Sequence, residues 1–214
     1  MNVDIVINSI PGYRELLKLY EEIDKKTARL KEKKKLSCIL GCRKCCETPA
    51  ENIQVSIFEV IPLAAELWKN DSANIILEKI DDQESSKNCV LYVRDTMIYK
   101  NGGCSFYKLR PLICRLFGFS AIIDKYGKKE LSVCKIIRKS RNELIQEIRN
   151  KIEDSDDLPV FSEYTQRLMG INPYLGQNRY PINVAIKKAI ELIGYKLMLT
   201  ENLESDTQKS EYSV

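Results

Sequence analysis

The sequence predicts a mainly α-helical protein with a small β-hairpin or meander, that is, an α+β fold. Proline and glycine are scarce, at seven and nine of 214 residues, in a chain that is 44% hydrophobic and 30% charged. This ordinary composition indicates a globular chain long enough for one real hydrophobic core. Leu, Ile, Lys and Glu are plentiful, a balance that favours helices over a many-stranded sandwich.

The residue patterns in the first part of the chain predict three helices. Apolar residues at three- and four-residue spacings predict an amphipathic helix over residues 12–35, ending in the basic run KEKKK. A second helix is expected from Ser56 to Trp68, because Ser56-x-x-Glu59 has the pattern of a capping box. Residues 72–82 predict a short third helix.

The middle of the chain predicts strands. Residues 89–100 are rich in β-branched and aromatic residues, and the turn signal Asn101-Gly102-Gly103 follows, so we expect a small hairpin or meander. Such a unit is marginal by itself and needs something to hold it. A short helix over 111–116 and a strand over 119–123 complete this part.

The remaining residues predict helices over about 133–152, 161–169 and 181–199, with the acidic break EDSDDLP between the first two. We therefore expect four parts along the chain. These are an N-terminal amphipathic helix at 1–35, a cysteine-cluster domain at 36–140, C-terminal helices packing on it at 141–200, and a disordered tail at 201–214.

Eight cysteines and no histidine are the most informative feature of the composition. A disulfide framework would need an oxidising compartment. The N-terminal residues MNVDIVINSIPGYREL lack the basic and long apolar regions of a signal peptide, and the most apolar stretch, 55–68, is too short to span a membrane. We expect a cytoplasmic protein with no membrane contact, whose clustered cysteines are metal ligands or redox thiols.

Four of the cysteines lie within nine residues as Cys38-x3-Cys42-x2-Cys45-Cys46, and a tight turn of this kind points several thiols at one centre. The others are dispersed, and the alternative for each isolated one is a small buried apolar side chain. All eight are candidate ligands: Cys38, Cys42, Cys45, Cys46, Cys89, Cys104, Cys114 and Cys134. Adjacent cysteines rarely both bind one mononuclear ion without strain. The pair at 45–46 thus suggests two metals, a multinuclear cluster, or one ligand beside a spare thiol.

Soft sulfur ligands select zinc, copper(I) or iron–sulfur centres, so we expect an iron–sulfur cluster or zinc as cofactor. The helical domain would wrap around this cysteine-ligated site. Basic residues beside the ligands could donate N–H···S hydrogen bonds, the alternative being plain surface residues: Arg43, Lys44, Arg110 and Arg115. The spacing of Cys38, Cys42 and Cys45 also equals that of the cysteine triad in radical-SAM enzymes. However, neither a β/α alternation nor a glycine-rich segment follows it, and one cysteine is surplus.

These segments resemble the YkgJ-type cysteine-cluster family, known by its CxxCxxCC signature and described as a zinc- or iron-chelating domain. The resemblance covers about residues 36–140 and is carried by CILGCRKCC, NCVLY, CSFYKLRPLICRLF and SVCKIIRKSR. The first spacing is three residues here instead of two. The family's middle motif matches at six positions: Cys104, Tyr107, Arg110, Pro111, Cys114 and Arg115. The resemblance implies metal chelation, with zinc and iron–sulfur both open.

The residue patterns favour one function and leave two others open. The favoured one is a metal-binding protein whose metal is structural, sensory or redox-active, because no catalytic constellation is visible. The alternative is a cluster-dependent enzyme of a redox or methyl-transfer type, since a related pattern occurs in flagellin lysine methylases. That alternative predicts a pocket holding Arg110 or Tyr107 beside an open coordination position. A nucleic-acid-binding module is least favoured, because the excess of basic residues at 108–141 is by itself weak evidence for nucleic-acid binding. The sequence indicates no particular protein partner.

Overall fold

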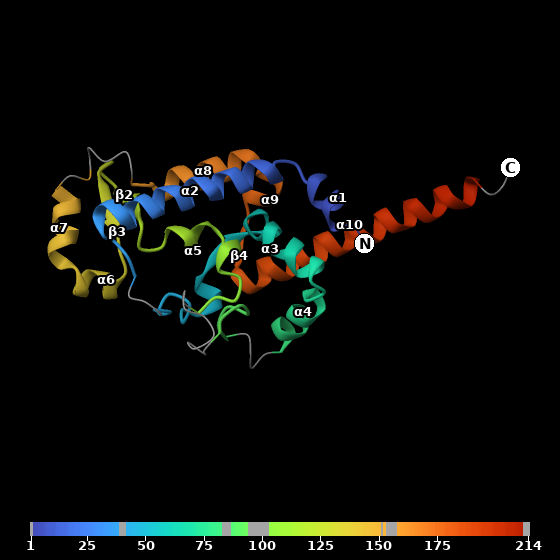
Figure 1. The fold of residues 1–214 in the computed structure, drawn as a ribbon, viewed down its shortest axis with the longest axis horizontal. Coiled ribbons are helices and arrows are strands. Elements are labelled where there is room, and N and C mark those ends of the chain that lie inside the picture. The colour runs from blue at the N-terminus through green and yellow to red at the C-terminus, as the bar shows by residue number, and fades with distance from the viewer. Residues whose placement is uncertain are drawn as a thin grey trace.

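In the computed structural model, the described residues are 2–38, 42–82, 87–93, 103–150, 152 and 158–211. These residues are mostly helical and carry two small antiparallel sheets, so the α+β prediction is confirmed (Figure 1). The helices are α1 Val3–Asn8, α2 Tyr13–Lys34, α3 Ile57–Lys69, α4 Ala73–Asp81, α5 Leu112–Leu116, α6 Lys135–Ser140, α7 Asn142–Asn150, α8 Phe161–Ile171, α9 Pro173–Gly176 and α10 Ile182–Glu211. Short 3-10 turns lie at Ala50–Asn52 and Tyr107–Leu109.

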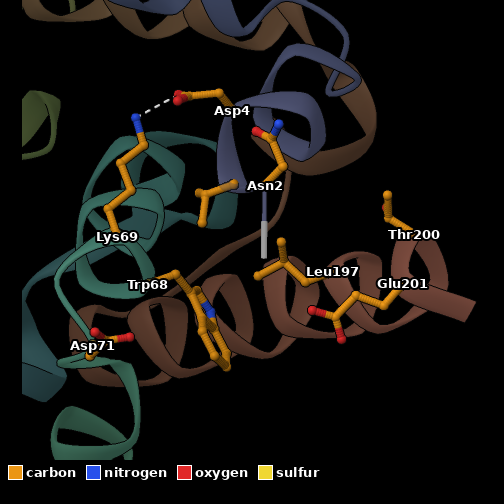
Figure 2. A pocket seen from close by; sticks show the side chains of 9 residues that line it. Asn2, Asp4, Trp68, Lys69, Asp71, Leu197, Thr200 and Glu201 are labelled. Carbon is orange, nitrogen blue, oxygen red and sulfur yellow. Dashed lines mark hydrogen bonds and ion pairs between the residues drawn. The ribbon is translucent and has the colours of Figure 1, made fainter. Parts of the chain in front are cut away.

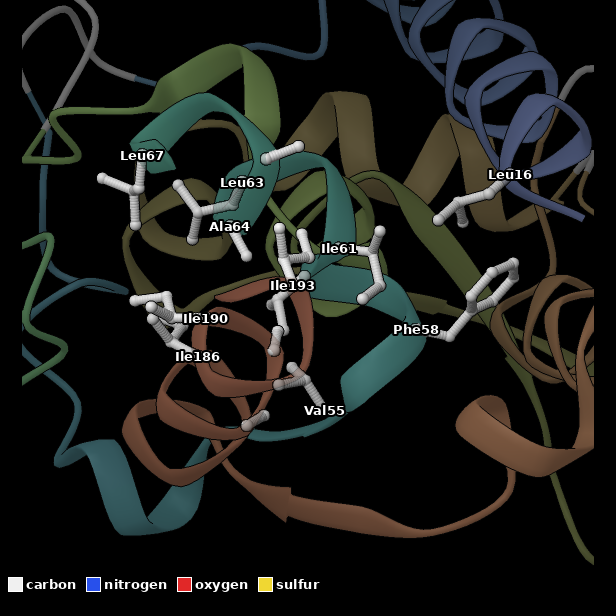
Figure 3. Close-up of a cluster of buried hydrophobic side chains, with 14 of the residues drawn as sticks. Leu16, Val55, Phe58, Ile61, Leu63, Ala64, Leu67, Ile186, Ile190 and Ile193 are labelled. Carbon is white, nitrogen blue, oxygen red and sulfur yellow. The ribbon is translucent and has the colours of Figure 1, made fainter. Parts of the chain in front are cut away.

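The main hydrophobic core lies between α3 and α10. Nearly every residue of α3 from Phe58 to Leu67 is buried, as expected of a helix that is apolar on all sides. Figure 3 shows its side chains meeting those of α10, among them Ile186, Ile190 and Ile193. Helices α1, α2 and α8 contribute further side chains to the same core.

A short sheet holds the first residues of these two helices together. Strand β1 (Gln54–Ser56) pairs antiparallel with β4 (Arg179–Pro181), with Val55 opposite Tyr180. Strand β1 leads directly into α3, and β4 leads directly into α10. The predicted capping box is confirmed, because Ser56 Oγ accepts from the Glu59 N–H while the Glu59 carboxylate accepts from the Ser56 N–H.

A second core forms around the hairpin of β2 (Ser120–Ile123) and β3 (Lys129–Ser132). Gly127 makes the turn between these strands with a φ of +81°, a conformation that favours glycine. Buried residues from the second half of α2 and from the segment after it join this core, together with α6 and α7. They include Leu30, Leu36, Ile137 and Ile145.

The structure differs from the sequence predictions at several elements. Helix α1 and strands β1, β3 and β4 were not predicted, because each is short and gains its stability from long-range packing or pairing. The single helix expected over 133–152 is divided at Arg141, and the division lets α7 pack against β3. Helix α10 continues through residues 201–211 of the expected tail, where the sequence contains neither glycine nor proline to end it.

The predicted hairpin at 89–100 falls partly outside the described residues, which omit 94–102. The described flanks are paired: Tyr92 bridges Cys104, the Val93 N–H donates to the Gly103 carbonyl at 2.9 Å, and the Ser105 N–H donates to the Leu91 carbonyl at 3.0 Å.

Within the described ranges, no helix is both long enough and apolar enough to cross a membrane.

Gly194 of α10 provides a test of the main core. A Cβ at this position would lie 2.7 Å from Cζ2 of Trp68, whose Nε1–H is held by the Ile190 carbonyl at 2.9 Å. We expect Gly194→Ala to lower the free energy of unfolding by about 1–3 kcal/mol through overpacking, although alanine favours a helix. Denaturant unfolding measures this difference.

Gly170 of α8 is the matched control, since nothing lies within 4 Å of a Cβ placed there. Gly170→Ala should raise the free energy of unfolding by up to about 1 kcal/mol. If Gly194→Ala were stabilising to the same extent, the close packing of Trp68 on α10 would be wrong.

Candidate metal centre

Five of the eight cysteines line one cavity of about 140 Å³. They come from segments far apart in the sequence: the turn at 42–48, the paired segments around residues 89–93 and 103–105, and α5. They are Cys45, Cys46, Cys89, Cys104 and Cys114. All eight cysteines are free thiols. The remaining wall is largely apolar and includes Leu91, Ile113 and Phe117.

The turn that carries Cys45 and Cys46 is closed by its own backbone. The N–H groups of Cys46 and Glu47 both donate to the Arg43 carbonyl, at 2.8 and 3.2 Å. Lys44 Nζ lies 2.6 Å and Arg43 Nε 3.7 Å from the Glu47 carboxylate. For these two basic residues the sequence left open N–H···S donation or a plain surface position, and the structure shows each paired with Glu47.

The segment that carries Cys89 is attached to α10 by the buried side-chain amide of Asn183, a contact that the sequence did not predict. Asn183 Oδ1 accepts from the Val90 N–H at 2.9 Å, and its Nδ2 donates to the Asn88 carbonyl at 3.0 Å. Asn183 is only 6% exposed. An asparagine in the first turn of a helix resembles an ordinary capping residue, so no signal in the sequence distinguishes this role.

Arg110 lies in the cavity wall and holds the turn before α5. Its Nε donates to the Tyr107 carbonyl and its Nη1 to the Cys114 carbonyl, both at 2.9 Å. The guanidinium stacks on the Tyr107 ring, 3.5 Å from the centroid. Arg110, Tyr107 and Arg115 were the residues expected beside the cofactor. Of these, Arg110 lines the cavity, and Tyr107 stacks on its guanidinium without lining the cavity.

The Arg115 side chain contacts α2 and lies outside the cysteine cavity. Its Nε donates to the Arg110 carbonyl at 2.7 Å, and its Nη2 donates to the Lys108 carbonyl. Its Nη1 pairs with Asp24 of α2, and the guanidinium lies 4.2 Å from the ring centroid of Tyr20. The Arg115 side chain lines a separate surface pocket with these α2 residues, so the structure does not bring it to the cysteine cavity.

The start of α5 is tied to α3 by the fully buried Glu59. Its Oε1 accepts from the Leu112 N–H at 3.2 Å, and its Oε2 accepts from Ser56 and lies 3.4 Å from Arg179 Nη1. Burial raises the pKa of Glu59, while Arg179 and the N–H donors oppose that shift. Because Leu112 lies two residues before Cys114, this carboxylate helps to set where the cysteine points.

Burial dominates the electrostatics of the cavity thiols. It raises the pKa of Cys89 to about 12 and raises the pKa values of Cys104 and Cys114 as well. Cys45 is the exception: a hydrogen bond from Cys46 and the nearby Arg110 charge lower its pKa to about 6. The pKa of its donor Cys46 is raised accordingly. A bound cation would reverse the penalty on the buried thiolates.

Three predicted ligands lie outside the lining of this cavity: Cys38, Cys42 and Cys134. Cys38 follows α2 and is exposed, and Cys42 is half-buried. Cys134 is the N-cap of α6, where its Sγ accepts from the Ile137 N–H at 3.4 Å. The structure therefore divides the predicted ligand set into cavity cysteines and outlying cysteines.

The donor set fits a thiophilic metal centre. Within the described ranges, no three Cys, Asp or Glu side chains surround a point closely enough to hold a single ion as they lie. Five cysteines line one cavity, and sulfur is the ligand that zinc and iron–sulfur clusters take.

A larger surface pocket of about 650 Å³ lies away from the thiols, between α1, the end of α3 and α10 (Figure 2). The described residues that line it include no cysteine. Its Lys69 and Asp4 are paired with each other at 2.6 Å, and its Trp68 donates to α10. This pocket therefore offers no ligand to a thiophilic metal.

Replacing the Glu59 carboxylate tests how the cavity is positioned. Glu59→Gln would turn an amide N–H₂ toward existing donors and leave Arg179 without its buried partner. We expect a loss of about 2–4 kcal/mol in the free energy of unfolding. In metal-free protein, alkylation of Cys114 followed by mass spectrometry should become faster.

Glu66→Gln is the control, because Glu66 lies on the same helix but is exposed, and it should change neither quantity. Equal behaviour of the two variants would show that Glu59 does not hold α5.

Comparison with known proteins agrees with the chemistry of this site. A family model described as "CxxCxxCC: Putative zinc- or iron-chelating domain" matches residues 37–153, a range that contains all eight cysteines. No curated protein matches the chain. No solved structure matches it either. Because the family model spans more than half of the sequence, the chain belongs to the CxxCxxCC family of zinc- or iron-chelating domains.

Proposed function

We propose that the cavity holds an iron–sulfur cluster and that the protein uses it in a structural and redox role. The observation that carries the proposal is the convergence of five thiols, from segments far apart in the sequence, on one cavity of about 140 Å³. Four of them would supply the ligands: Cys46, Cys89, Cys104 and Cys114. Cys45 is exposed and would stand at the rim.

The size of the cavity favours a cluster over a single zinc ion. Four sulfurs that each lie about 2.3 Å from one zinc are only about 3.8 Å from each other and leave no volume between them. The cavity thiols line a space of about 140 Å³, which has room for a multinuclear group. The family description, zinc or iron chelation, is compatible with this choice.

The residues around the thiols suit a negatively charged sulfur cluster. The Arg110 guanidinium lies in the wall, and the backbone N–H groups of Leu91 and Phe106 hydrogen bond to Cys89 and Cys104. Such donors and the apolar lining stabilise and tune a cluster. When bound, the cluster would supply one-electron chemistry. A thiolate-bound cluster would need a reducing compartment, which we expect to be the cytoplasm.

Cys114 and Cys89 give the direct test. We expect protein purified without oxygen to be brown and to contain iron and acid-labile sulfide. Cys114→Ser and Cys89→Ser should each lose most of that iron, together with the visible absorption. Both should also unfold at lower denaturant, because ligation free energy is also folding free energy. Metal and sulfide analysis with absorption spectra measures these changes.

Cys134→Ser is the matched control, since Cys134 lies outside the cavity, and it should keep the cluster. A colourless protein that holds only zinc would overturn the cluster while keeping the thiolate site. A protein without metal, all of whose thiols react freely, would overturn the function itself.

A further inference from the structure

The positive charge of the chain is concentrated in the segments that build most of the second core. The chain as a whole carries a formal charge of +4. Residues 29–37 and 119–150 together contain thirteen basic and five acidic residues, a charge of +8, so the rest of the chain is net acidic at −4. The acidic run EDSDD at 153–157 lies outside the described residues. Charge of one sign gathered on one part of a protein is typical of a surface that binds a polyanion.

The second core places basic residues from α2 and α6 at the same end of the molecule (Figure 1). Three exposed basic residues are each adjacent in the sequence to a buried residue of this core: Lys31 to Leu30, Lys35 to Leu36, and Arg138 to Ile137. Lys31 Nζ also lies 5.2 Å from the ring centroid of Phe119, directly before β2. Side chains about a hundred residues apart in the sequence therefore contribute to one basic surface.

The basic residues of this surface have few acidic partners. Elsewhere in the molecule, ion pairs of 2.6 Å join side chains of different elements: Lys69 with Asp4, Arg167 with Glu22, and Lys187 with Asp81. Among the described residues, no carboxylate forms an ion pair with the exposed Lys35, Arg138 or Arg141. Their charges are therefore available to an anion from outside the chain.

The turn between β2 and β3 adds an aromatic ring to this end of the molecule. Tyr126 is 75% exposed, and Lys125 Nζ lies 4.9 Å from its ring centroid. Asp124 Oδ1 accepts from the N–H groups of Tyr126 and Lys128, both at 2.8 Å, and these bonds order the turn. An exposed ring on an ordered turn among lysines is a surface on which a nucleic-acid base can stack.

We propose that this basic surface binds single-stranded nucleic acid. Its phosphates would contact four residues from α2 and α6, while a base would stack on Tyr126. The four are Lys31, Lys35, Arg138 and Arg141. In the sequence the basic excess stood alone, and the structure adds the convergence of two distant segments and an exposed ring. The inference goes beyond the proposed function and needs no metal in the cysteine cavity.

An anionic membrane surface suits this end of the molecule less well. Proteins that bind membrane surfaces insert a continuous apolar face between their basic residues. Ile122 and Ile123 are exposed, at 43% and 42%, but consecutive residues of a strand point to opposite faces of the hairpin. Their cross-strand partners, Glu130 and Lys129, are charged. These side chains therefore do not form one apolar patch.

Fluorescence anisotropy with end-labelled strands of about 20 nucleotides tests the proposal, with RNA and DNA of mixed sequence as separate arms. We expect the protein as purified to bind at least one of them with a dissociation constant of about 10⁻⁶ to 10⁻⁴ M at physiological salt, and more weakly as salt rises. The triple variant Lys35→Glu/Arg138→Glu/Arg141→Glu should weaken binding at least about tenfold. Tyr126→Ala should weaken it about fivefold or more, and Tyr126→Phe, which keeps the ring, should not. Circular dichroism checks that each variant is folded.

Lys18→Glu/Lys79→Glu/Lys188→Glu is the matched control, because these exposed lysines lie outside the basic surface and their reversal changes the net charge equally. It should weaken binding by no more than about twofold. Equal weakening by the two triple variants would overturn the proposal, since net charge alone would then explain binding. A duplex of the same sequence that binds as tightly, with no effect of Tyr126→Ala, would overturn the single-stranded ligand.

Sedimentation with vesicles of phosphatidylcholine and phosphatidylserine separates the membrane alternative. Binding to these vesicles but to neither strand would overturn the proposal in favour of a membrane surface. Binding to neither vesicles nor strands would overturn it as well. All of these outcomes are independent of the iron, sulfide or zinc content of the protein, so they leave the proposed cluster to its own test.

Discussion

The buried carboxylate of Glu59 is the interaction on which the arrangement of this molecule depends. A fully buried charge is tolerated only where donors or an opposite charge surround it. Here Ser56 and Leu112 donate hydrogen bonds to the carboxylate, and Arg179 Nη1 lies 3.4 Å away as an ion pair. Ser56 belongs to the end of β1, Leu112 to the start of α5, and Arg179 to β4. None of these elements can move alone without leaving the carboxylate or a donor unsatisfied. The position of α5, and with it Cys114, therefore follows from a residue that is no ligand itself.

The two arginines of the Arg-Pro-x-x-Cys-Arg motif act chiefly on the backbone. An irregular segment that packs on a core must find partners for its carbonyl groups, and Arg110 and Arg115 together satisfy those of residues 107, 108, 110 and 114. A guanidinium can serve several acceptors in fixed directions, which a lysine cannot. The motif thus combines one proposed ligand, Cys114, with the arginines that hold the backbone around it, and these backbone contacts account for both arginines.

Features that depend on local pattern could be predicted from the sequence, and features that depend on distant partners could not. The periodicity of α2 and the capping box of α3 are local, so their ranges were predicted closely. The pairing of β1 with β4 joins three residues to three others across more than a hundred positions, and no local signal marks it. The sequence likewise identified the cysteines by type and spacing, but which of them line one cavity and the contacts of Asn183 depend on tertiary packing.

Residues 42–48 lie along the chain between Leu36 of the second core and Ala50 of the main core, and none of them is part of either core. Residues 42–48 form turns and bends between the main core and the second core, and their apolar side chains are few. Such a segment cannot be ordered by hydrophobic burial, because it has little to bury. Under the proposed function, ligation through Cys46 would add free energy to the hydrogen bonds and ion pairs that close this turn. A metal centre held by Cys46 and Cys114 would then couple the order of this turn to the position of α5 on the main core.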